Sequence, residues 1–500
     1  MGSKNILVLG LLAALLAAFG LSVGLREHGN ASATAASAVS SRGALGADDK
    51  AKAKDKPTGT KASESLKATN SDSEKTATAE AVTPIAPPMD RQIRTIAYGW
   101  DLMAPGLLGS KQDKSNAKSF QGHQLDVAFT AADNLSDVKA ALALGGADKD
   151  GADIAIVPLP EMVAAYEDLR ALEPEIFFIV GWSRGRDAVY GMNGKTLIKP
   201  RSSAKAPVKL AGESGKASTL LALYLLDLAG VPPKDIQLVT DTKKADFVAR
   251  NRASDEAAPE NSRVLMTSAD AHLLVPYVAI APAGFLKNRR ATRAWLAGWL
   301  EGVEELRNDV PSAARKVAAV EGAPETIDLV RQLGQIDFAG LDGNVRRAGL
   351  SGRDAVTLDE LFKLTWHLWR SAGVVTTPTP NRVPFSSEGL AALVLASSTK
   401  PSTDAPRTGD IDFSTAPIIR IQLKASKDTD AHDRSMKRIA LVSGIFSDSA
   451  LRLGSKRAKK ATTEEIESLV SRFGLNASRF QADHRLSKKN TTTLEVLATP

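Results

Sequence analysis

Residues 153–182, DIAIVPLPEMVAAYEDLRALEPEIFFIVGW, decide the fold of this chain. The stretch opens on an apolar run at 153–159 and closes on another at 175–182, and the segment between them has apolar residues at helical spacing. Apolar runs of this length joined by a helix are typical of a mainly parallel sheet that is covered on both faces. The stretch therefore predicts an α/β domain.

The same alternation extends to both sides of this stretch. Helical segments are expected at 134–146 and about 215–230, a short helix from Asp270, and mainly helices over 286–372. The strand-like runs between them are IRTIAYGW (93–100), QLDVAFT (124–130), KTLIKP (195–200), VKLAG (208–212), DIQLVTD (235–241), RVLMTS (263–268) and YVAIAP (277–282). We expect two α/β lobes between which the chain crosses more than once, with a cleft between them.

Composition divides the chain into segments. Residues 29–90 are dominated by small, charged and hydroxylated residues, and cannot bury enough apolar surface to offset the entropy of ordering, which predicts a flexible linker. The two-lobed body follows over 91–376, with lobe 1 formed by 91–182 and 276–376 and lobe 2 by 183–275. A linker rich in Ser, Thr and Pro is expected over 377–409, before a small patterned domain at 410–500.

An uncharged apolar run at 6–25 follows Lys4. A helix of about 20 residues can cross a hydrocarbon core of about 30 Å, which predicts an N-terminal transmembrane anchor within 1–28. The alternative is a cleaved secretory signal, because small residues such as Ala31 and Ala33 follow the run. Both interpretations export the chain. The anchor predicts a single-pass protein of the bacterial inner membrane with its bulk in the periplasm.

Composition also excludes several classes of function. The chain has no cysteine, which excludes disulfides, thiolate metal ligands and cysteine nucleophiles. The net charge of +7 predicts either contact with anionic envelope polymers or lipid headgroups, or simply a solvated basic surface. Nucleic acid is not an expected partner, because the chain is exported. The six histidines form no metal-like cluster, and no hydrolase motif is present. We expect no metal, no cofactor and no enzymatic activity.

Five stretches of the body share one family resemblance: IAYGWDLMAPGLL (96–108), DIAIVPLPEMV (153–163), IVGWSRGRDAVYG (179–191) with NGKTL (193–197), AGESGKASTLLALYLLDLAGV (211–231) and TSADAHLLVPYVAIAP (267–282). Through them the body resembles the periplasmic solute-binding proteins of ABC importers, in the phosphate, nitrate or sulfonate branch. The resemblance implies a type II-like two-lobed fold that closes on a solute by hinge motion, and an ABC permease as a partner.

A candidate anion or zwitterion site begins at 214–219, in GESGKAST. The stretch opens an apolar helix, where backbone N–H groups, hydroxyls and a lysine would meet at the positive helix terminus. The contributing residues would be Ser214, Gly215, Lys216, Ser218 and Thr219. Ordinary helix capping by Ser214 or Ser218 explains the same residues without a ligand. A P-loop is excluded, because the spacing of the glycines does not fit.

Other candidate ligand contacts follow expected strands, where open α/β sheets bind ligands. Arg184, beside Ser183, either clamps an oxyanion or forms a salt bridge with Asp187. Trp100 either stacks on the solute or packs within its lobe, and Asp101 lies beside it. Asp270 is either a helix N-cap or a ligand contact.

The segment 410–500 resembles the OmpA-like peptidoglycan-associating domain, through LGSKRAKKA (453–461), FGLNASRF (473–480) and TTTLEVLA (491–498). Strands are expected at IDFSTAP (411–417) and MKRIALVSGIFSDS (436–449), and a helix at ATTEEIESLVSRFG (461–474). The resemblance implies that Asp448 and Arg457 bind the peptidoglycan stem peptide. The loop after Asp448 is shorter than in that family, and the leading serine is Gly454, which predicts a weakened or lost peptide site.

Two functions fit these patterns. The first is a membrane-anchored solute-binding protein that captures a small anion or zwitterion and associates with the wall. The second is a structural scaffold of the cell envelope, in which both modules have lost their ligands.

Overall fold

The computed structural model describes residues 88–110, 120–201, 203, 205–252, 257–396, 411–424, 428–455, 459–486 and 491–498. They lie in one compact unit, Thr83–Pro500. The apolar run at 6–25, expected to form the membrane anchor, lies outside the described residues, as does most of the linker at 29–90. Among the described helices, none has both the length and the apolar composition needed to cross a bilayer.

Lobe 1 is built on a mixed sheet in the order β2-β1-β3-β10-β4-β11. β1 lies parallel to β2 and β3, whereas β10 is antiparallel to β3 and β4, and β11 is antiparallel to β4. The strands are β1 (Ile93–Tyr98), β2 (Val127–Ala132), β3 (Ile154–Pro158), β4 (Pro174–Ser183), β10 (Pro276–Pro282) and β11 (Ile336–Phe338). Every residue of β3 is buried, as expected for a central strand between two helical layers.

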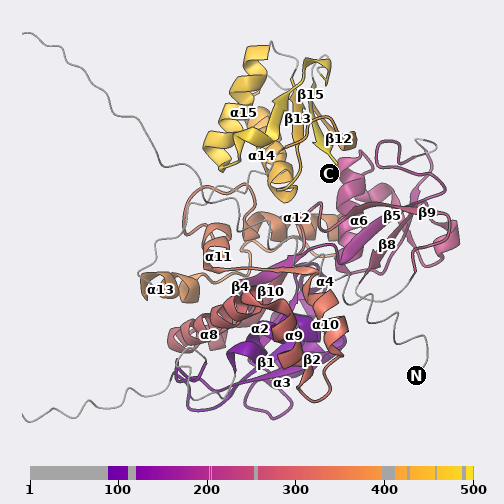
Figure 1. Ribbon diagram of the computed structural model, residues 1–500. Coiled ribbons are helices and arrows are strands. Elements are labelled where there is room, and N and C mark those ends of the chain that lie inside the picture. Colours follow the sequence, from indigo (N-terminus) through magenta and orange to yellow (C-terminus); the bar gives the residue numbers. More distant parts are fainter. Residues whose placement is uncertain are drawn as a thin grey trace, which may run out of the picture. The chain divides into compact units, whose positions relative to one another are not determined.

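Helices surround this sheet (Figure 1). α8 lies along α2, and both belong to an apolar cluster in which Trp295 stacks on Trp299 with ring centroids 5.1 Å apart. The helices are α2 (Trp100–Gly109), α3 (Leu135–Leu144), α4 (Leu159–Ala164), α5 (Tyr166–Leu169), α7 (Ala283–Leu286), α8 (Arg289–Asn308), α9 (Val310–Ala318), α10 (Thr326–Leu333), α11 (Leu341–Arg347), α12 (Leu358–Ser371) and α13 (Glu388–Ala396), with the 3-10 turn Arg170–Leu172.

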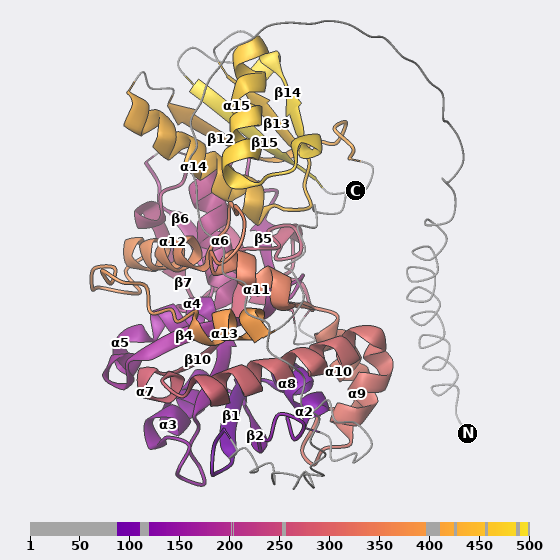
Figure 2. The same ribbon diagram turned by 90° about the vertical axis from the view of Figure 1, so that its left-hand side faces the viewer.

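Lobe 2 repeats the plan on a sheet in the order β7-β6-β8-β5-β9. β6 is parallel to β7 and β8, and β5 is antiparallel to β8 and β9. The elements are β5 (Asp187–Met192), β6 (Val208–Ala211), α6 (Ala217–Leu228), β7 (Ile236–Val239), β8 (Phe247–Asn251) and β9 (Ser262–Thr267), with 3-10 turns at Pro233–Asp235 and Thr242–Lys244. Figure 2 shows α6 beside α12, which belongs to lobe 1.

The chain crosses between the lobes twice, after β4 and after β9. The first strand after each crossing, β5 or β10, lies antiparallel to both of its neighbours in the sheet of the next lobe. This confirms the predicted α/β architecture with two lobes. Three details of the sequence-based prediction were wrong. Residues 195–200 form no strand, no helix follows Asp270, and strands β5 and β8 were missed.

The prediction of a linker over 377–409 is wrong for the first half of that range. The N–H of Ile176 donates to the carbonyl of Pro384 at 2.8 Å, and Phe385 forms a parallel β-bridge with Ile176. Helix α13 then packs on α8. Pro384 has no N–H but keeps its carbonyl, and the N–H of Ser386 donates to the carbonyl of Ile176 at 2.8 Å, so the segment adds to the edge of the sheet and belongs to lobe 1.

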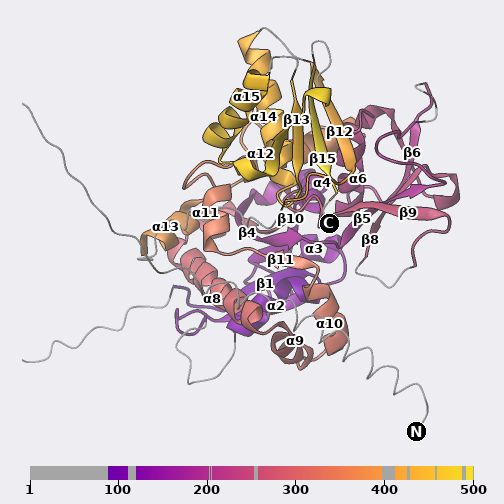
Figure 3. The same ribbon diagram turned by 45° about the horizontal axis from the view of Figure 1, so that its top comes forward.

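The C-terminal region is a four-stranded sheet in the order β12-β15-β13-β14, with α14 and α15 on one face (Figure 3). Its elements are β12 (Pro417–Lys424), α14 (Thr429–Ile445), β13 (Leu451–Gly454), α15 (Lys459–Phe473), β14 (Phe480–Ala482) and β15 (Thr491–Leu497), with 3-10 turns at Ala477–Arg479 and His484–Leu486. The helix expected near 461–474 is confirmed. The strands expected at 411–417 and 436–449 are wrong, because β12 starts at Pro417 and 436–445 belong to α14.

Candidate functional site

The candidate site is the seam between the lobes, where the carboxyl ends of β1, β3 and β6 meet. Lys216 is the N-cap residue of α6 and comes from lobe 2. Its ammonium donates to the hydroxyl of Tyr98 at 2.9 Å and to Glu161 Oε2 at 3.3 Å, and both partners belong to lobe 1. The ammonium also lies 5.1 Å from the centre of the Tyr98 ring. A lysine of one lobe is therefore bound by a carboxylate and a phenol of the other.

Burial sets the charge state of this pair. Glu161 is almost fully buried, and this burial raises the pKa of its carboxyl to about 7, although the charge of Lys216 opposes the shift. Burial also acts to lower the pKa of Lys216, but the Tyr98 hydroxyl and the Glu161 charge outweigh it and raise the pKa above its ordinary value. Lys216 is thus a fixed cation, whereas its partner changes charge near neutral pH.

A second ion pair joins the lobes deeper in the seam. Arg186, in the first crossover, pairs with Asp101 at the start of α2, and both side chains are buried. The guanidinium also lies 5.8 Å from the centre of the Tyr277 ring and 3.5 Å from its hydroxyl. The other oxygen of Asp101 accepts the N–H of Leu102 at 2.9 Å. A buried charge needs such partners, so this pair holds the lobes in register.

The two crossovers are tied together by hydroxyls. Ser183 Oγ donates to Asp187 Oδ2 at 2.7 Å and lies 2.7 Å from Ser268 Oγ, which in turn accepts the N–H of Gly185 at 2.9 Å. Asp187 is fully buried, and this burial raises the pKa of its carboxyl to about 6 against the opposing effects of Ser183 and Arg186. Ser183 is therefore part of the hinge and bonds to the chain itself.

The helix terminus at 214–219 lies at the seam, and its residues after Lys216 are buried. Gly215 has a φ of 84°, which favours glycine, and a Cβ built on it would lie 3.3 Å from the Cβ of Ala164 in α4. Ser218 and Thr219 are buried, and within the described residues Thr219 Oγ1 has no hydrogen-bond partner. Ser214 is exposed. The predicted capping by Ser214 or Ser218 is wrong, because no side chain caps α6.

The remaining candidates lie at the edges of the seam. Arg184 is exposed, and Asp187 bonds to Ser183, so the predicted salt bridge from Arg184 to Asp187 does not form. Trp100 is half-buried against the apolar cluster of lobe 1, with its ring near Gly322. Asp270 Oδ2 accepts the N–H of Thr267 at 2.8 Å and closes a turn, not a helix.

Sequence reasoning missed the residues that face each other across the seam. The arginine buried in the seam is Arg186 and not Arg184, and the carboxylate that meets Lys216 comes from Glu161. Arg186 follows the same crossover strand as Arg184, and Glu161 lies in the motif 153–163, so their positions were visible in the sequence. Nothing in the sequence showed which residues would pair.

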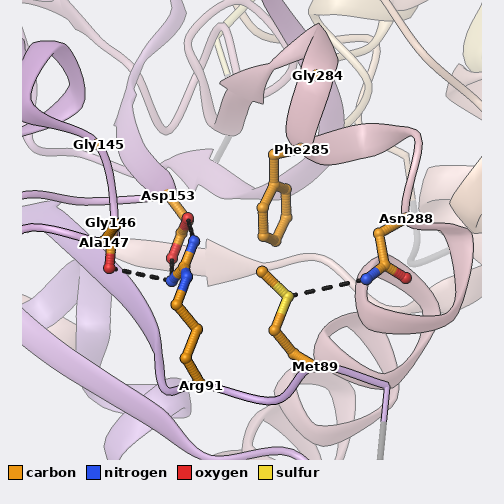
Figure 4. Close-up of a pocket in the computed structure, with 9 residues that line it drawn as sticks. All are labelled: Met89, Arg91, Gly145, Gly146, Ala147, Asp153, Gly284, Phe285 and Asn288. Atoms are coloured by element: carbon orange, nitrogen blue, oxygen red, sulfur yellow. Dashed lines mark hydrogen bonds and ion pairs between the residues drawn. The ribbon is translucent and has the colours of Figure 1, made fainter.

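Two hollows of the described surface lie away from the seam. One, of about 390 Å³, is lined by Met89, Arg91, Asp153 and Phe285, and Arg91 pairs with Asp153 there at 2.6 Å (Figure 4). Arg91 and Asp153 precede β1 and β3, so this hollow lies at the opposite ends of these strands from the seam. The other, of about 380 Å³, lies beside α8 and α13. The seam itself is held by the chain's own charged side chains.

The residues expected to bind peptidoglycan are only partly described. Arg457 lies outside the described residues. Asp448 is exposed and follows helix α14, so the strand-end position that the resemblance gave it is wrong. It lies 3.9 Å from His272 Nδ1 and accepts the hydroxyl of Ser447 at 3.1 Å.

The chain matches no protein-family model and no curated protein sequence. Among solved structures, it is similar to the periplasmic aliphatic sulphonate binding protein of Escherichia coli, with a TM-score of 0.44, 14% identity, and 65% of this chain and 99% of that chain covered. The periplasmic nitrate-binding protein of Synechocystis PCC 6803 gives a TM-score of 0.38 and 12% identity, with 59% and 91% covered. A sulfonate-binding protein of Methylobacillus flagellatus KT gives 0.41 and 13%, with 62% and 96% covered. The strand orders of the two sheets establish the two-lobed architecture.

Proposed function

We propose that this chain is a solute-binding protein of the bacterial periplasm that captures a small anionic or zwitterionic solute in the seam between its lobes. The observation that carries the proposal is the pair of opposite charges at the carboxyl ends of the strands, with Lys216 on lobe 2 facing Glu161 and Tyr98 on lobe 1. An anion would replace Glu161 on Lys216, and a zwitterion could also use Glu161 for its cationic group. Opening and closing of the lobes about the two crossovers would admit the solute.

The finer parts of this function rest on the sequence. The apolar run at 6–25 would anchor the chain in the inner membrane, and the resemblance of the body to importer proteins would make an ABC permease its partner. The C-terminal region would be an OmpA-like module that associates with peptidoglycan. In support of this module, the chain follows a β-α-β-α-β-β order there, although the position of Asp448 does not favour the stem-peptide site of that family.

Ligand-dependent stabilisation tests solute capture. The full chain is screened by thermal shift with phosphate, nitrate, sulfonates and amino acids, because a ligand that binds only the folded state raises the melting temperature. For a solute that gives a shift, Lys216→Met should weaken binding at least about tenfold, and Glu161→Gln should tighten binding of an anion by removing its competitor. Lys139→Met is the matched control, since Lys139 is similarly exposed but pairs with Asp168 on the surface of lobe 1.

A second function, a structural scaffold of the envelope, is favoured by the closed seam. Both ion pairs across the seam use the chain's own side chains, and Gly215 packs directly on Ala164. This function predicts no thermal shift with any solute in the screen and retention of the full chain on purified sacculi. A solute shift that is lost in Lys216→Met would exclude it as the sole function.

A further inference from the structure

The last turn of α14 lies on the crossover that joins β9 to β10. The N–H of Leu273, within this crossover, donates to the carbonyl of Ile445 at 3.1 Å. The next residue, Phe446, is fully buried and stacks on Tyr224 of α6, with ring centroids 6.4 Å apart and planes at 20°. An exposed ion pair from Arg438 to Asp227, at 3.0 Å, extends the same contact along α6. The C-terminal region is therefore joined to lobe 2 and to its hinge.

The same turn also contacts lobe 1. Gly444 lies so close to the segment before α12 that a Cβ on it would meet Val356 Cγ2 at 2.5 Å and the Cβ of Ala355 at 3.1 Å. Glycine inside a helix costs about 1 kcal/mol relative to alanine, and here it permits the close approach. Nearby, Arg353 donates to the carbonyl of Ser471 in α15. One helix end thus packs on both lobes at once.

His272 connects all three parts at this junction. Its Nε2 lies 2.9 Å from Asp337 Oδ2 in β11 of lobe 1, and its Nδ1 lies 3.3 Å from Ser447 Oγ at the end of α14. His272 itself belongs to the crossover between β9 and β10. The crossover cannot turn without disturbing its contacts to lobe 1 and to the C-terminal region.

We infer that the C-terminal region is a clamp on the hinge, and that the end of α14, residues 444–447, must leave the crossover before the lobes can open. Hinge motion requires the crossover segments to change their backbone angles. Here one crossover donates a backbone hydrogen bond to α14, and the apolar cluster around Phe446 is continuous with the cores of both lobes. The inference rests on the two-lobed architecture and not on any solute, so it can fail or hold independently of solute capture.

Distance measurements between the lobes test the clamp. Since the chain has no cysteine, the substitutions Ala140→Cys on α3 and Thr240→Cys in lobe 2 allow two spin labels to be placed on the full chain. Both positions are exposed. Pulsed electron resonance should give a narrow distance distribution in the otherwise unchanged protein. Phe446→Ala and Arg438→Asp should each add a second, longer distance, because they weaken the contact of α14 with α6.

The control is Arg472→Asp, which breaks an Arg–Asp pair of the same 3.0 Å length and similar exposure inside the C-terminal region, where Arg472 meets Asp433. It should leave the distribution narrow. The charge reversal Arg438→Asp with Asp227→Arg should restore the narrow distribution, which a general loss of stability would not do. An unchanged distribution in both Phe446→Ala and Arg438→Asp, or an equal response in the control, overturns the clamp. If Phe446→Ala fails to fold, Arg438→Asp and its reversal decide the matter alone.

Discussion

The seam between the lobes and the junction with the C-terminal region differ in how their surfaces are joined. Charged groups close the seam: Lys216 with Glu161, and Arg186 with Asp101. The centre of the junction is apolar, with Phe446 on Tyr224 and Gly444 on Val356. A solute with matching charges can replace an ion pair, whereas nothing soluble replaces a buried aromatic ring. The comparison indicates that a solute can exchange with the charged groups of the seam, whereas release of the junction exposes apolar surface and costs more free energy.

The largest effect is expected at the junction. Phe446→Ala removes a fully buried ring and leaves a cavity between α14 and α6, which should lower the free energy of unfolding by about 3–5 kcal/mol. Urea unfolding followed by circular dichroism measures the loss. Leu395→Ala is the control, because Leu395 is 88% exposed and its truncation should change little. A loss below about 1 kcal/mol for Phe446→Ala would mean that the Phe446 ring contributes little to the packing of the junction.

The buried ion pair of the seam should respond nearly as strongly. Asp101→Ala leaves the Arg186 guanidinium buried without its carboxylate and should cost about 3 kcal/mol, since the ring and hydroxyl of Tyr277 still partner the guanidinium. The double variant Asp101→Leu with Arg186→Met removes both charges and should recover much of this loss. Urea midpoints of the single and double variants are compared. If the single variant costs nothing, the pair does not hold the lobes in register.

The outer ion pair of the seam should depend on pH. Burial raises the pKa of Glu161 from its ordinary 4.5 to about 7, so the folded protein holds this proton more tightly than the unfolded chain. The resulting stability is fully present below pH 4.5 and is lost as pH rises through about 7. Between pH 4.5 and 7, the stability of Glu161→Gln should therefore fall by about 1–2 kcal/mol less than that of the unchanged protein.

Thermal unfolding of both proteins across pH 4.5–7.5 measures this difference. Asp187, whose pKa burial raises to about 6, contributes a fall of the same sign in both proteins, so the difference between them reports Glu161 together with its repulsion by Asp187. Identical pH profiles would show that Glu161 releases its proton at the same pH in the folded protein as in the unfolded chain.

The sequence predicted the lobes well because their central strands are continuous apolar runs, such as β3, in which every residue is buried. It mistook α14 for a strand because IALV is rich in residues that favour strands, although buried Met436, Ile439, Ala440 and Ser443 follow a helical period. The prediction chose Arg184 over Arg186. Gly185 stands between them, and only the structure shows that its φ of 85° turns the chain there. Pairing across the seam depends on this tertiary geometry, which local patterns do not contain.

The smallest effect is expected at the rim of the junction. Arg438→Ala removes a partly exposed ion pair with Asp227, and such pairs contribute about 0–1 kcal/mol to stability. Arg472→Ala, which removes the comparable pair with Asp433, should cost about the same in urea unfolding. The two variants should therefore be alike in stability and differ in lobe opening, because only Arg438 reaches across to α6. If the two variants differ in stability by more than about 1 kcal/mol, the Arg438–Asp227 pair stabilises the junction by more than an exposed ion pair can. The junction would then depend on charge as the seam does, and the contrast between the two surfaces would be lost.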